Sequence, residues 1–167
     1  MVIMGVDPGL NATGYGFLEA GAQLRLISAG EIRPPRTLPI EQRLGLIRDE
    51  LAALMRRYRP GAVVLEKLFT HHAHVTTAAL MGHARGAACL AAHDHGAPVA
   101  EYPVTQIKKS ITGSGHATKD QMGRMVSTWL GVANPGWSAD AADALALAIV
   151  HAHTASQNRR LPAGVTR

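Results

Sequence analysis

The chain has 167 residues, of which 47% are hydrophobic, and it carries a formal net charge of +5. Its length and apolar content predict one compact domain, and they exclude global disorder and a membrane span of roughly 18 apolar residues. No signal segment is evident, and the single cysteine, Cys89, cannot form an internal disulfide, so we expect a cytoplasmic protein. The basic charge favours a polyanionic partner, although a solvated surface without any partner is the alternative.

The first part of the chain predicts an antiparallel meander and then a helix. Residues 2–6, 13–19 and 23–32 have the composition of strands, and turns rich in Gly and Ala separate them. Apolar residues at helical spacing predict a helix that ends near Tyr58. The continuous apolar run at 62–65 predicts a central strand that is covered on both faces.

The rest of the chain predicts helices with one more strand. Residues 73–95 predict a long helix crowded with small side chains, which would permit close packing either inside one domain or across a dimer. A short strand is expected at 98–102, and three helices are expected after it. They are a brief helix at 106–111, a helix opened by the capping box Thr118-x-x-Gln121, and a last helix that Ser138 caps and that ends near His153.

This order of elements predicts an α/β fold whose sheet has mixed strand directions. We expect one domain over residues 1–155 and a flexible polar C-terminal tail over residues 156–167. The sequence contains no internal repeat and no low-complexity segment that would indicate another architecture.

Four carboxylates occur at the ends of apolar elements. Asp7 ends the run MVIMGVD, Glu66 ends GAVVLE, and Asp140 and Asp143 share one face of the last helix. Taken singly, Asp7 could shape a turn, Glu66 could emerge into water, and Asp140 could be a first-turn acid that the helix dipole stabilises. Asp143 lies among alanines and a leucine, where an acid is costly unless it is neutralised. A pair of divalent cations would neutralise all four acids, and two-metal sites hydrolyse phosphodiesters.

The segments VIMGVDPGLNATGYGF, VLEKLF, HARGAA and ADAADALALAIVHAH resemble the bacterial RuvC family of Holliday junction resolvases. The resemblance extends from about residue 2 to residue 155, nearly the whole chain. It implies a ribonuclease H-like fold, with a five-stranded mixed sheet flanked by helices. It also implies a homodimer that nicks two opposed strands of four-way junction DNA symmetrically, with motor proteins of the RuvA and RuvB families as partners.

By this resemblance the catalytic and metal-binding residues are Asp7, Glu66, Asp140 and Asp143. Together they would hold two Mg²⁺ ions about 4 Å apart, for which Mn²⁺ could substitute. Asp7 is the best candidate to bridge both ions, because it would end a central strand. The expected products carry a 5′-phosphate and a 3′-hydroxyl.

The resemblance also implies three DNA-binding residues. Phe69 occupies the position of an aromatic side chain that stacks at the junction centre, although ordinary core packing is the alternative. Lys108 and Lys119 match basic positions near the scissile phosphate. A phosphate docked at the helix N-terminus would offset the unfavourable dipole that Lys119 meets there. Lys109 and Arg85 are kept only as possible contacts to the DNA backbone.

The sequence is also compatible with three other functions. A related ribonuclease H-like hydrolase would cut RNA–DNA hybrids or other branched nucleic acid, and a binding module would hold junctions without cutting them. An actin-like ATPase shares a strand followed by Asp-x-Gly, but the chain is short for its two lobes.

The histidines near Phe69 could contact DNA or a metal, or simply line a polar loop; they are His71, His72 and His74.

Overall fold

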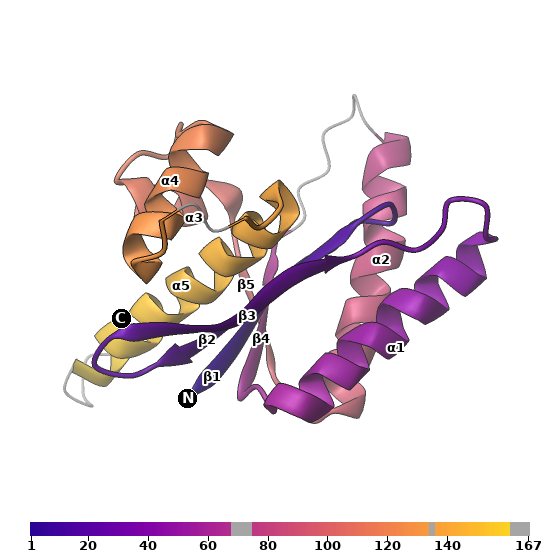
Figure 1. The fold of residues 1–167 in the computed structure, drawn as a ribbon, viewed down its shortest axis with the longest axis horizontal. Coiled ribbons are helices and arrows are strands. Elements are labelled where there is room, and N and C mark those ends of the chain that lie inside the picture. The colour runs from indigo at the N-terminus through magenta and orange to yellow at the C-terminus, as the bar shows by residue number, and fades with distance from the viewer. Residues whose placement is uncertain (68–74, 134–135, 161–167) are drawn as a thin grey trace, which may run out of the picture.

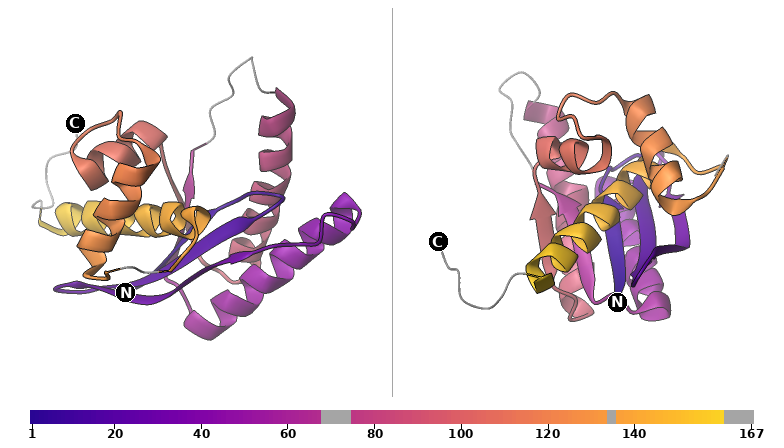
Figure 2. Two further views of the ribbon diagram at one scale, coloured as in Figure 1. Left: turned by 45° about the horizontal axis from the view of Figure 1, so that its top comes forward. Right: turned by 90° about the vertical axis from the view of Figure 1, so that its left-hand side faces the viewer.

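The computed structural model describes residues 1–67, 75–133 and 136–160, with 75–77 and 158–160 described by their backbone alone. Along these residues the elements are, in chain order, β1 (Val2–Asp7), β2 (Thr13–Ala20), β3 (Leu24–Ile32), α1 (Ile40–Tyr58), β4 (Ala62–Glu66), α2 (Val75–Asp94), β5 (Val99–Tyr102), α3 (Val104–Thr112), α4 (Lys119–Leu130) and α5 (Ala139–Arg160). Helices α1 and α2 cover one face of the sheet, and α3, α4 and α5 cover the other (Figure 1). Figure 2 shows the same three layers from two further directions.

The strands form one five-stranded sheet in the order β3-β2-β1-β4-β5. Antiparallel pairing joins β1 to β2 and β2 to β3, which confirms the predicted meander. Parallel pairing joins β1 to β4 and β4 to β5, so the predicted mixed sheet is also confirmed. Strand β4 lies between two other strands, and its apolar residues are buried in the cores on both faces of the sheet, as we expected for a covered central strand.

Side chains alternate between two cores because successive residues of a strand point to opposite faces. Met4 and Val63 point toward α1 and α2, where five buried alanines of α2 complete the packing. Ile3 and Val64 point toward α3, α4 and α5 and meet Leu145. The small side chains of α2 thus serve packing inside one subunit, which was one of the two expected uses.

Helix boundaries mostly follow the expected caps. In α4 the Gln121 backbone N–H donates to the Thr118 hydroxyl at 3.2 Å, and the Gln121 side chain accepts from the Thr118 N–H at 2.9 Å. Helix α5 begins after Ser138, whose hydroxyl accepts a bond from a backbone N–H of the first turn. The helix continues to Arg160, beyond the expected end near His153, so the first part of the predicted tail is helical. Its Gln and Arg residues are good helix formers.

The predicted flexibility of the tail cannot be compared with the structure over residues 161–167, which lie outside the described part of the chain. It therefore stays a prediction there. Within the described part, no helix combines the length and the apolar character that crossing a bilayer would require.

Three glycines allow α5 to lie directly against the sheet. A Cβ atom at Gly5 would be 1.8 Å from the carbonyl oxygen of Ala144, and one at Gly14 would be 2.0 Å from the carbonyl oxygen of Asp140. At Gly16 a Cβ would also meet the helix, mainly a leucine side chain. Backbone can approach backbone this closely only where the side chain is absent. The first turn of α5 is therefore held against β2.

Candidate active site

Asp7 and Glu66 end neighbouring strands at the same edge of the sheet. The register between β1 and β4 ends with the pair Val6 and Leu65, and each acid follows its strand's last pair by one residue. Because parallel strands end at the same edge, the two acids lie next to each other. The alternation of side chains along both strands places both carboxylates on the face that α5 covers.

The first turn of α5 brings Asp140 and Asp143 to the same place. The Asp140 backbone lies against Gly14, which is the strand partner of Asp7. Asp143, Asp140 and Glu66 all act electrostatically on the Asp7 carboxyl group. The structure thus brings together the four acids that the sequence analysis selected, while their catalytic role stays a prediction.

The gathering of negative charge changes the protonation of the site. Burial, followed by the charges of Asp143, Asp140 and Glu66, raises the pKa of Asp7 to about 7, and Lys119 opposes this rise. Burial is also the main cause that raises the pKa of Glu66 and of Asp143. A cluster of desolvated carboxylates with raised pKa values is typical of a functional site.

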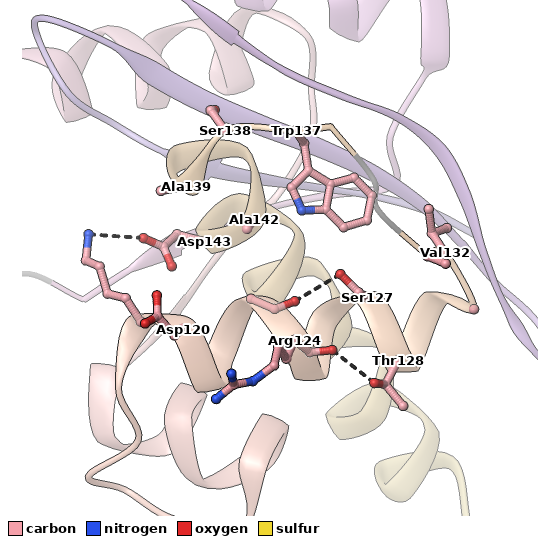
Figure 3. A pocket seen from close by; sticks show the side chains of 14 residues that line it. Asp120, Arg124, Ser127, Thr128, Val132, Trp137, Ser138, Ala139, Ala142 and Asp143 are labelled. Carbon is pink, nitrogen blue, oxygen red and sulfur yellow. Dashed lines mark hydrogen bonds and ion pairs between the residues drawn. The ribbon is translucent and has the colours of Figure 1, made fainter.

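The donor set fits a hard divalent cation. All four side chains offer carboxylate oxygens, which are the ligands that Mg²⁺ and Mn²⁺ prefer. Within the described residues, no three side chains of His, Cys, Asp or Glu already surround one point as a metal would require. The Lys119 ammonium lies 3.7 Å from the Asp143 carboxylate and offsets part of the negative charge of the site (Figure 3).

The raised pKa of Asp7 predicts an unusual dependence of stability on pH. Between the ordinary value of 3.8 and about 7, the folded metal-free protein holds a proton on Asp7 that the unfolded chain releases. This contribution to stability is therefore lost as the pH rises through about 7. Melting of metal-free protein should show the loss, and Mg²⁺ should raise Tm more at about pH 8 than at about pH 5.5. The Asp7→Asn variant should lack this component; a pH profile identical to that of the native chain would contradict the assignment.

The structure brings both predicted lysines to the site. Lys119 is the first residue of α4, and its side chain forms an ion pair with Asp143. The side chain is otherwise open to solvent, with 81% of its surface exposed. Lys108, on α3, acts electrostatically on Glu66 and on Asp143. Both ammonium groups therefore lie where a negatively charged substrate would approach the acids.

Other predicted DNA contacts have different outcomes. The Arg85 side chain is only 12% exposed and bonds within the protein, and its possible contact with the DNA backbone stays a prediction. Lys109 is exposed on α3, and its role stays a prediction. Phe69 and the three neighbouring histidines lie in residues 68–74, outside the described residues.

A groove of about 910 Å³ extends from Asp143 along α4. In Figure 3 the labelled side chains Arg124 and Thr128 of α4 lie across this groove from Trp137. Arg124 and Trp137 could not be predicted, because neither stands in a motif and only the tertiary fold places them beside the acids. The three sheet glycines were also missed, although the alternation of Gly14 and Gly16 was a visible signal for a face without side chains.

Comparison with known proteins agrees with this geometry. Residues 3–151 match the family model described as crossover junction endodeoxyribonuclease RuvC. Curated proteins with that description from Halorhodospira halophila and Bordetella avium are 47% and 45% identical, over 90% and 96% of this chain and 89% and 88% of their own lengths.

Solved structures give the same result. The structure of T. thermophilus RuvC in complex with Holliday junction substrate superimposes with a TM-score of 0.87 and 34% identity, covering 95% of this chain and 96% of that one. The yeast mitochondrial Holliday junction resolvase Ydc2 shares the fold at a TM-score of 0.68, with 11% identity and coverage of 94% and 81%. The fold is thus the ribonuclease H-like fold that the sequence predicted, and the chain belongs to the RuvC family of crossover junction endodeoxyribonucleases.

Proposed function

We propose that this chain resolves four-way DNA junctions by two symmetric nicks, using a pair of Mg²⁺ ions held by Asp7, Glu66, Asp140 and Asp143. The observation that carries the proposal is the convergence of these acids at one sheet edge, where three of them have raised pKa values. Family membership supports the substrate, since a T. thermophilus relative is described in complex with a Holliday junction. We also propose a cytoplasmic location, since the chain resembles a bacterial family that acts on DNA.

The carboxylates would bind the cations and fix their position. When bound, such a metal pair makes water a better nucleophile and stabilises the leaving 3′ oxygen, leaving a 5′-phosphate and a 3′-hydroxyl. Asp7 ends the central strand β1 and interacts with all three other acids, so it is the residue best placed to contact both ions. The Asp7 carboxyl group has to lose its proton before it can bind a metal ion.

Lys119 would change partners when the site is loaded. Its ammonium pairs with Asp143 in the metal-free protein. With the acids neutralised, this lysine would be free to contact a phosphate of the substrate at the N-terminal turn of α4, where backbone N–H groups also favour an anion. Lys108 would contribute a second positive charge beside Glu66.

The groove along α4 supports a path for the DNA strand next to the cut. Lys119 and Asp143 line one end of it, so the groove is continuous with the acids. Arg124 provides a phosphate contact farther along, and Trp137 provides a flat apolar wall. A strand that follows this groove would reach the acids at the start of α5.

A homodimer would present two such sites to the two opposed strands of a junction. Helix α2 carries large apolar side chains that one subunit leaves exposed, with 40% of Leu80, 36% of Met81 and 58% of Leu90 accessible. Exposed apolar side chains on one helix support a protein interface. Motor proteins of the RuvA and RuvB families are proposed as partners on the basis of family membership alone.

The decisive experiment uses end-labelled synthetic four-way junctions, incubated with the protein with and without Mg²⁺ or Mn²⁺. We expect paired nicks at symmetric positions that a DNA ligase can seal. Faster cleavage of an RNA–DNA hybrid would instead support the broader ribonuclease H-like activity. Binding without any nick in either metal would support a non-cutting junction-binding module.

Replacing Phe69 with alanine should slow junction processing while metal affinity stays unchanged. Loss of aromatic stacking on one base costs about 1–3 kcal/mol, which corresponds to about 5- to 150-fold. Nicking rates should be compared with the affinity for Mn²⁺ measured without DNA. An unchanged nicking rate would show that Phe69 does not stack on the junction and would favour the alternative of ordinary core packing.

A further inference from the structure

We infer that Arg85 is a positioning residue that holds the metal ligand Glu66 in place from the opposite face of the sheet. The inference rests on the proposed function, in which Glu66 binds metal. Arg85 belongs to α2, whereas the Glu66 carboxylate lies on the face that α5 covers. Arg85 therefore acts on the backbone of the catalytic strand and not on substrate.

Two hydrogen-bonded partners hold the guanidinium. Its Nη1 donates to the backbone carbonyl oxygen of Glu66 at 2.6 Å, and its Nη2 pairs with the Glu101 carboxylate on β5. With only 12% of the side chain exposed, the positive charge requires such partners. The planar fork of arginine can reach both at once, which a lysine ammonium cannot do with the same geometry.

We call these two bonds of Arg85, to the Glu66 carbonyl and to the Glu101 carboxylate, the clamp. Its position at the end of β4 explains why the strand needs it. The register between β1 and β4 ends at Val6 and Leu65, so the ladder on that side stops before Glu66. On the other side Glu66 pairs with Tyr102 of β5, and the next N–H, that of Lys67, donates to the Tyr102 carbonyl at 2.8 Å. Arg85 adds a bond at the point where pairing with β1 has ended.

The Glu101 pair ties the same guanidinium to the neighbouring strand. Glu101 lies opposite Leu65, one residue before the pair of Glu66 and Tyr102. Arg85 thereby links α2, the end of β4 and the end of β5 at one point. Partners of this kind, which orient a metal ligand without touching the metal, typically contribute 10- to 100-fold in metal affinity or activity.

The test measures Mn²⁺ binding to DNA-free protein by electron paramagnetic resonance, together with nicking at varied Mg²⁺ and junction binding without metal. Arg85→Met should weaken Mn²⁺ binding about 10- to 100-fold and leave metal-free junction binding unchanged. Arg85→Lys should be intermediate, and Glu101→Gln should be closest to the native chain because the carbonyl bond persists. Arg25→Met, which removes an exposed ion pair with Glu19, is the matched control and should behave as the native chain.

Several outcomes would overturn the inference. Native Mn²⁺ affinity in Arg85→Met would show that no clamp is needed, and full rescue by Arg85→Lys would show that charge suffices without the fork. If Arg85→Met does not fold, the comparison of Arg85→Lys with Glu101→Gln still decides between these alternatives. Glu66→Gln separates the two proposals: native Mn²⁺ binding there would overturn the metal assignment itself, whereas weakened binding there with native binding in Arg85→Met would overturn only the clamp.

Discussion

Replacing Asp7 with asparagine should abolish junction nicking and leave junction binding intact. The change keeps the size of the side chain but removes a charged oxygen ligand that interacts with all three other acids. We expect the nicking rate to fall at least about 10³-fold, which corresponds to about 4 kcal/mol in the activation barrier. Binding should persist, because Asp7 is half-buried beneath α5 and offers no positive charge to a phosphate.

Single-turnover nicking and a metal-free gel-shift assay on the same junction would check this result. Asp49→Asn, which changes an exposed acid of α1, is the matched control and should leave both measurements unchanged. The metal-free Asp7→Asn protein should also melt higher than the native chain at about pH 8, because a source of repulsion is gone. Substantial nicking by Asp7→Asn at saturating Mg²⁺ would refute its assignment as a metal ligand.

Replacing Gly14 with alanine should separate the acids without changing any of them. The new Cβ would lie 2.0 Å from the Asp140 carbonyl oxygen and 2.3 Å from its carbon, so the first turn of α5 has to move away from the sheet. Overpacking of this kind costs about 1–3 kcal/mol of folding stability. A shift of about 1 Å at a catalytic group can cost about 10²-fold in rate, and we expect nicking to fall at least that far.

Nicking should be measured at a temperature where circular dichroism shows the variant to be folded, so that lost activity reflects geometry. Gly45→Ala is the control, because a Cβ at that position of α1 meets nothing within 4 Å. In a helix interior this control should gain up to about 1 kcal/mol. Native nicking by a folded Gly14→Ala protein would show that the close approach of α5 is not required for the site.

The sheet and its acids could be predicted because the relevant signals are local. The run that ends in Glu66 is apolar without interruption, so it identified both a central strand and the end of that strand. The capping box of Thr118 and Gln121 likewise located the start of α4 within the sequence itself. Strand ends and helix starts then determined which acids could meet.

Arg85 could not be assigned in this way, because its environment depends on residues far along the chain. As a single cation among small residues of a helix, it has the same local sequence context whether its side chain faces water or the end of β4. Its partners, Glu66 and Glu101, are brought to it by strand pairing. Trp137 and Arg124 present the same difficulty, since only the packing of α4 beside α5 creates the groove between them.

The order of elements along the chain has a consequence during protein synthesis. Strand β1 emerges from the ribosome first, but α5, the helix that covers Ile3 and approaches Gly5, emerges last. Until α5 has been synthesised, the apolar face of the sheet that it covers is exposed to solvent. Chaperones bind exposed apolar surface of this kind. During the same interval Asp7 and Glu66 lack Asp140 and Asp143 of α5, so under the proposed mechanism the nascent chain would not cut DNA before translation has reached that helix.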